Sequence, residues 1–106
     1  MAVVKIKFAH PMLMGVAYFR MMAPDAAEHV RGYLKEGKWY NEESELFTVN
    51  GDSKDAAEEV FDLTNNPWRQ DERMEKYGNG RSLSVGDIVV VGEEQWVCLS
   101  VGWAEI

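Results

Sequence analysis

Few side chains in this sequence could carry out a reaction. Nucleophilic catalysis needs a thiol or hydroxyl, a base within hydrogen-bonding reach of it, and a third group that orients the base. The only imidazoles are those of His10 and His29, and neither has an evident partner along the chain. The lone thiol, Cys98, stands among apolar residues that should raise its pKa and make it inert. We therefore predict no catalytic residues and no enzymatic activity.

Motifs for metal ions and phosphate groups do not match this chain either. Zinc sites use closely spaced Cys and His ligands, whereas this chain has one Cys and two distant His. The stretch Gly78-Asn79-Gly80-Arg81-Ser82 looks like a phosphate-binding loop, but it leads into a predicted strand and lacks the lysine of a P-loop. The sequence thus predicts no metal site and no cofactor, and a tight turn accounts for the glycines.

Short polar side chains precede the most apolar part of the chain. Ser82, Ser84 and Asp87 can accept hydrogen bonds from backbone N–H groups and so fix an arch that leads into a strand. In a second interpretation, Arg81 and the serine hydroxyls face a partner protein. A third interpretation, a small hydrolase-like enzyme acting through Ser82, Ser84 or Asp87, lacks an identifiable base.

Residues 66–81 are predicted to form the longest irregular stretch of the chain. An aromatic residue beside arginine, as in Trp68-Arg69, is a composition enriched in protein interfaces. The alternative is that Trp68 packs its ring over an edge of the sheet. If the stretch is an interface, replacing Trp68 and Arg69 together by Ala should weaken partner binding and barely change thermal stability. The candidate partner-binding residues are Trp68, Arg69, Arg73, Arg81, Ser82 and Ser84.

The chain is acidic, and its charge is unevenly distributed. Eleven Lys and Arg against eighteen Asp and Glu give a net charge of −7 over 106 residues. This argues against direct nucleic-acid binding, which relies on clustered cations. Residues 42–62 alone carry a net charge of −7. Three interpretations are open: a solvated helix face with the segment that leads into it, a docking patch for a protein, or an acidic mimic of nucleic acid that blocks a DNA- or RNA-binding protein. The candidate acidic patch consists of Glu42, Glu43, Glu45, Asp52, Asp55, Glu58, Glu59 and Asp62.

The elements that must position these residues follow from the hydrophobic pattern. The predicted elements are strands over 4–8 and 12–22 (the latter with a helix as its alternative), a helix over 24–36, a strand over 46–49, a helix from 52 or 53 to 65, hairpin arms over 88–91 and 95–101, and a last short pairing at 104–106. This order predicts one α+β domain spanning residues 1–106. Its antiparallel or mixed sheet should have about four or five strands, two helices on one face and a C-terminal β-hairpin.

The cellular setting is expected to be the cytoplasm. A single cysteine allows no intramolecular disulfide, and the first residues alternate apolar with basic side chains, unlike a secretory signal. No segment approaches the roughly 18 apolar residues that cross a bilayer. A soluble protein without a membrane partner is therefore expected.

The C-terminal part of the chain resembles a known group of proteins. The stretch Gly80-Arg81-Ser82-Leu83-Ser84-Val85-Gly86-Asp87 leads into the apolar run 88–90, with Trp96-Val97 on the returning strand and Gly102-Trp103 beyond it. Together with 60–66, these residues resemble the YodL-like domains and related small uncharacterised proteins of phages, plasmids and other mobile elements. The likeness covers residues 60–106. It departs at Arg81, where His is usual, and at Gly86, where a small polar residue is usual.

The resemblance implies a compact β-rich module of mobile-element origin and no known chemistry. Combined with the absence of a catalytic set and with four tryptophans, it leads us to expect a small acidic interaction protein without enzymatic activity. Its expected partner is a host or phage protein in the host cytoplasm.

Overall fold

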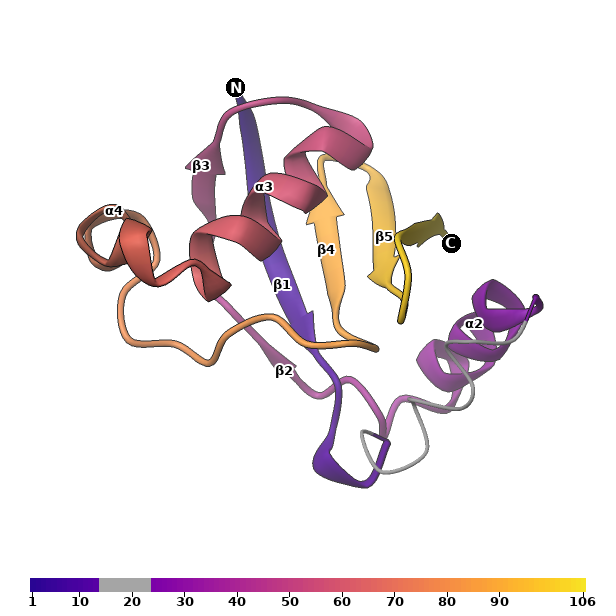
Figure 1. The fold of residues 1–106 in the computed structure, drawn as a ribbon. Coiled ribbons are helices and arrows are strands. Elements are labelled where there is room, and N and C mark those ends of the chain that lie inside the picture. Colours follow the sequence, from indigo (N-terminus) through magenta and orange to yellow (C-terminus); the bar gives the residue numbers. More distant parts are fainter. Residues whose placement is uncertain (14–23) are drawn as a thin grey trace.

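A computed structural model of the protein describes residues 1–13 and 24–106 (Figure 1). In these ranges the chain has the predicted α+β class, with a wholly antiparallel sheet of six strands. The strands are β1 (Ala2–Phe8), β2 (Glu42–Glu43), β3 (Phe47–Val49), β4 (Ile88–Val91), β5 (Glu94–Cys98) and β6 (Trp103–Glu105). The helices are α2 (Ala26–Glu36), α3 (Ser53–Asn65), the 3-10 helix η1 (Pro67–Arg69) and α4 (Gln70–Lys76). No helix in the described ranges is long and apolar enough to cross a lipid bilayer.

Strand β1 lies inside the sheet, whose order is β2-β1-β4-β5-β6. Strand β3 pairs with the first half of β1 and β2 with its second half, so that Val4 faces Phe47 and Lys7 faces Glu43. Because β4 occupies the other side of β1, residues 42–49 form one edge of the sheet. Strands β4 and β5 form the predicted hairpin, with Gly92 at its turn adopting the φ of 61° that glycine tolerates.

The two long helices cover opposite faces of the sheet, so the prediction that both lie on one face was wrong. Val89 of β4 packs in the same buried cluster as Val60 of α3. Its neighbour Ile88 packs with Val30 of α2 instead. Side chains alternate along a strand, and the two clusters therefore lie on the two faces of β4. The unbroken apolar run 88–91 is typical of a strand that is buried on both faces.

Most predicted elements are confirmed within the described residues, with boundary shifts of at most two residues except at the second hairpin arm. The strand predicted over Met12–Met22 lies outside the described residues except for Met12 and Leu13, which are helical. The strand predicted over 95–101 already ends at Cys98, because Leu99 N donates to Gly102 O at 3.0 Å and closes a turn. Strand β2 was not predicted, since two adjacent glutamates carry no strand signal.

The prediction that 66–81 is irregular was wrong, because η1 and α4 occupy 67–76. Neither helix has a buried residue, which leaves no apolar periodicity to detect. The Asn66 side chain instead caps the start of η1 by accepting a hydrogen bond from Trp68 N. Acidic residues in the first turn of α4 and basic residues in its last turn match the helix dipole.

Candidate functional site

Residues 66–81 connect the end of α3 to the stretch that leads into β4, and we call them the 66–81 excursion. Figure 1 shows α4 lying beyond the end of α3, away from the sheet. The base of the excursion is closed by side chains of α3: Leu83 N donates to Thr64 Oγ1 at 3.1 Å, and Asn65 Nδ2 donates to Leu83 O at 3.0 Å. Ser82 Oγ donates to Thr64 O at 2.7 Å. The excursion therefore starts and ends at a fixed point.

Arg73 ties α4 to this base. Its Nη1 donates to Thr64 O at 2.7 Å and to Ser82 Oγ at 3.1 Å, and its Nη2 donates to Gly80 O. The guanidinium also lies 5.7 Å from the centroid of the Tyr77 ring. Of the candidate partner-binding residues, Arg73 and Ser82 thus make their contacts within the chain.

Arg69 ties α4 to α3 through three carboxylates. Its guanidinium donates to Glu59 at 2.7 and 2.8 Å and to Asp62 at 2.8 Å, both on α3. It also donates to Glu72 on α4 at 3.0 and 2.8 Å. These hydrogen bonds raise the pKa of Arg69, and the bond from Arg69 is the main reason that the pKa of Glu72 is lowered from 4.5. The angle between the two helices is therefore held by a branched ion-pair network.

Trp68 stands between these fixed residues with its indole in solvent. Its side chain is 92% exposed, the highest value among the large apolar residues that the structure describes. Its backbone is held because its N–H donates to Asn66 Oδ1 at 3.0 Å and Arg69 N donates to Asn66 O at 3.0 Å. The alternative that Trp68 packs over the sheet edge was wrong. The structure instead presents a bare indole on a constrained backbone.

Arg81 and Asp87 form the centre of the predicted arch. Asp87 is fully buried and accepts four hydrogen bonds, two from the Arg81 guanidinium at 2.8 and 2.9 Å and one each from Ala9 N and Ser84 N at 2.7 and 2.8 Å. The architectural interpretation is confirmed for Asp87. Arg81 also stacks over the Phe8 ring at 4.7 Å, so both of its Nη groups and one face of its guanidinium are engaged within the chain.

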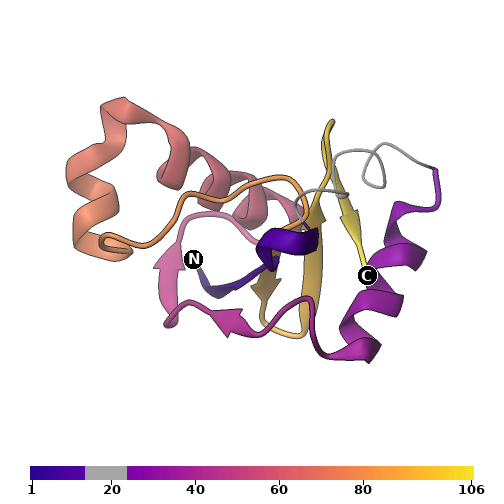
Figure 2. The same ribbon diagram turned by 90° about the horizontal axis from the view of Figure 1, so that it is seen from below.

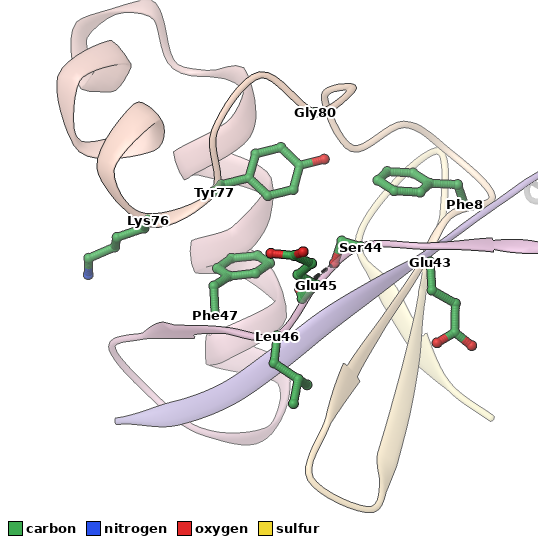
Figure 3. A pocket seen from close by; sticks show the side chains of 9 residues that line it. All are labelled: Phe8, Glu43, Ser44, Glu45, Leu46, Phe47, Lys76, Tyr77 and Gly80. Carbon is green, nitrogen blue, oxygen red and sulfur yellow. Dashed lines mark hydrogen bonds between the residues drawn. The ribbon is translucent and has the colours of Figure 1, made fainter.

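A cleft of about 300 Å³ opens between the 42–49 edge of the sheet and the end of α4 (Figure 3). Its aromatic walls are Phe8, Phe47 and Tyr77, which come from β1, β3 and the excursion. This cleft leaves no signal in the sequence, because its walls are up to 69 residues apart in the chain and only the fold brings them together. The remaining lining residues are Glu43, Ser44, Glu45, Leu46, Lys76 and Gly80.

Comparisons with known proteins add no further guide to function. No family model, curated protein or solved structure matches the chain. Function must therefore be inferred from the exposed indole, the charges around it and the cleft.

The acidic segment 42–62 does not form one continuous row of free carboxylates. Glu43 pairs with Lys5 at 2.6 Å, and Glu58 lies 3.9 Å from Lys54. Two further members of the segment pair with Arg69, as described above. The other four lie on β2 (Glu42), before β3 (Glu45), at the N-cap of α3 (Asp52) and in its first turn (Asp55). Half of the candidate acidic patch is thus compensated by cations of the chain.

Cys98 lies on β5, His29 lies on α2, and His10 follows β1. Cys98 is buried, and burial raises the pKa of its thiol to about 12, the direction expected for a thiol among apolar residues. His29 Nε2 lies 3.2 Å from Asp25 Oδ2 at the start of α2. His10 Nδ1 accepts a hydrogen bond from Met12 N at 3.1 Å. These contacts are with residues four and two positions away in the chain.

Proposed function

We propose that the protein is a small non-enzymatic module that binds another protein by inserting Trp68 into an apolar pocket of that partner. The observation that carries this proposal is the 92% exposed indole on a backbone fixed from both sides. Leaving a large aromatic side chain in water forgoes about 2 kcal/mol that burial would supply. Tryptophan is also the residue type most enriched among binding hot spots.

The backbone around Trp68 is ordered, which supports a binding role for its exposed side chain. Residues next to it are held by the Asn66 cap and by the five hydrogen bonds of the Arg69 guanidinium. Association costs less when the contact residue is already ordered in the free protein. Asn66 and Arg69 therefore support binding as positioning residues, and Trp68 makes the contact.

The charge around Trp68 indicates what surface the partner presents. Residues 52–76 contain eight acidic and four basic side chains, a net charge of −4. We infer that the partner carries an apolar pocket with a basic rim. Because rim charges act mainly on the association rate, added salt should slow binding more than it speeds dissociation.

The biological setting that we propose follows from the resemblance of residues 60–106 to YodL-like proteins of mobile elements. We propose that a phage or related element encodes the protein and that it acts on a host or phage protein in the host cytoplasm. A nucleic-acid mimic is less well supported, since half of the acidic patch is paired within the chain. A mimic would lose affinity steeply with salt, whereas an indole-centred interface should retain most of it.

Affinity capture with three forms of the protein tests the proposal. The parent, Trp68→Ala and Val101→Ala are immobilised in equal amounts, incubated with host lysate, and the captured proteins are quantified by mass spectrometry. Val101 is a matched control because it is 90% exposed and lies outside the excursion. We expect a partner retained by the parent and by Val101→Ala but reduced at least tenfold by Trp68→Ala. Equal capture by all three forms would show that Trp68 is not the contact.

A further inference from the structure

The cleft at the end of α4 has two well-fixed aromatic walls. Phe47 and Tyr77 lie with ring centroids 5.3 Å apart, and Phe47 is almost fully buried. The Tyr77 hydroxyl donates to Arg81 O at 2.5 Å, which fixes the far end of its ring. A Cβ at Gly80 would lie only 2.6 Å from that hydroxyl, so glycine at this position leaves room for the ring. Phe8 supplies the third aromatic wall (Figure 3).

Glu45 is the uncompensated charge in the lining of this cleft. Figure 3 shows its carboxylate next to Phe47 and Ser44 on the inner side, whereas Glu43 and Lys76 point outward. The carboxylate of Glu43 pairs with Lys5, and the ammonium of Lys76 lies 3.6 Å from Glu72. Within the described residues, the Glu45 side chain makes no ion pair. A cavity of this kind, with aromatic faces and one free carboxylate, matches an organic cation.

We propose that the cleft binds the guanidinium of an arginine side chain presented by a polypeptide. A planar guanidinium can stack on an aromatic face and donate two parallel hydrogen bonds to a carboxylate, which an ammonium group cannot do. The protein already uses this chemistry beside the cleft, where Arg81 lies 4.7 Å above the Phe8 ring and Arg73 lies 5.7 Å from the Tyr77 centroid. The volume of about 300 Å³ accommodates one long side chain.

The arginine site rests on the proposed function in one respect only: the proposed function is the reason for assigning the arginine to a protein partner. Trp68 precedes α4 and the cleft lies at the end of this helix, whose seven residues span about 10 Å. One interface of ordinary size, about 800 Å² per partner, reaches that far. The inferred basic rim of the partner is therefore expected to include an arginine that enters the cleft.

Titration with short peptides tests the site without the partner. The probe is acetyl-Gly-Arg-Gly-amide, and its counterpart with citrulline has the same shape without the charge. We expect saturable shifts of the amide NMR signals of residues 44–47 and 77–80 with the arginine peptide only. Glu45→Gln should weaken its binding about tenfold, whereas Glu42→Gln, on the neighbouring strand and outside the cleft lining, should change it less than twofold. Gly80→Ala, which displaces the Tyr77 ring, should also weaken it.

Three results would overturn the arginine site: no saturable shift at the cleft, equal binding of the citrulline peptide, or equal losses in Glu45→Gln and Glu42→Gln. The last result would mean that the peptide responds only to the overall negative charge. Failure of the proposed function is distinguishable, because Trp68→Ala should leave peptide binding unchanged. If Trp68→Ala does not change partner capture while the peptide still binds through Glu45, the arginine site is supported and the binding role of Trp68 is contradicted.

Discussion

The arch at Asp87 and the 66–81 excursion are both held by an arginine, but in different surroundings. Arg81 pairs with a carboxylate that is fully buried. Arg69 pairs with carboxylates near the surface, of which Asp62 is 52% and Glu72 38% exposed. A buried group that loses its partner cannot turn to water, whereas an exposed group can. The same chemistry therefore stabilises the whole fold at Asp87 and only positions a surface element at Arg69.

Matched Asp→Asn substitutions in the two regions should give the largest difference. Asp87→Asn removes the charge that receives two hydrogen bonds from Arg81 and two from backbone N–H groups. We expect it to lower the free energy of unfolding by about 3 kcal/mol or more. Asp62→Asn, which removes the charge of an exposed partner of Arg69, should cost less than about 1 kcal/mol.

Urea unfolding followed by circular dichroism measures both values. Similar losses in Asp87→Asn and Asp62→Asn would show that burial does not separate the two regions. The contrast between them would then have no energetic basis.

Removing the guanidinium of Arg69 should loosen the excursion and spare the sheet. Arg69→Gln leaves the carboxylates of α3 and α4 without their common partner, at a global cost of about 1 kcal/mol. Amide hydrogen exchange in α4 should speed up about tenfold, while exchange between β1 and β4 stays the same. Lys54→Gln is the matched control, because Lys54 and Glu58 both lie on α3 and do not join the two helices. Equal acceleration in both regions would contradict a local role for Arg69.

Acid should weaken the same network. The pKa of Glu72 is lowered from 4.5 in the folded protein, mainly by the hydrogen bond from Arg69. Its contribution to stability is therefore present above the unfolded pKa and is lost as the pH falls through the folded pKa. Between about pH 5 and pH 3, the parent should lose more stability than Arg69→Gln, whose Glu72 titrates near its ordinary value. Parallel curves for the two proteins would mean that Arg69 does not set this pKa.

The Trp68 side chain should contribute least to the stability of the fold. It is 92% exposed, and its removal empties no cavity. Trp68→Ala should change the free energy of unfolding by less than about 0.5 kcal/mol. A loss above about 1 kcal/mol in urea unfolding would show that the indole packs on the protein in solution.

The sequence was sufficient to predict the parts of the fold that are marked by apolar periodicity. The alternation of Val4 and Ile6 with lysines predicted β1, and the apolar face of α3 predicted its length. Helix α2 was predicted on the same face of the sheet as α3, which was wrong. The run 88–91 places apolar side chains on both faces of its strand and so indicates that both faces are covered. Helix α4 was missed because polar caps and charge pairs stabilise it in place of a buried face.

The sequence could predict which segment carries the candidate site but not how its side chains are arranged. Trp68 and Arg69 were predicted to form one interface because they are adjacent in the chain, but the structure places their side chains in different environments. The Arg69 guanidinium turns inward to three carboxylates, and Trp68 stays in solvent. The double substitution expected to be nearly neutral would therefore also break the network between α3 and α4. Trp68→Ala alone is the cleaner test, since it leaves that network intact.

The affinity of the purified captured partner for Trp68→Ala tests the central claim most directly. Isothermal titration calorimetry compares the parent, Trp68→Ala and Val101→Ala at one salt concentration. Removing a hot-spot indole costs about 2 kcal/mol or more of binding free energy. Kd should therefore rise about 30-fold or more in Trp68→Ala and less than about twofold in Val101→Ala. Equal Kd values for the parent and Trp68→Ala would contradict a binding role for the exposed indole.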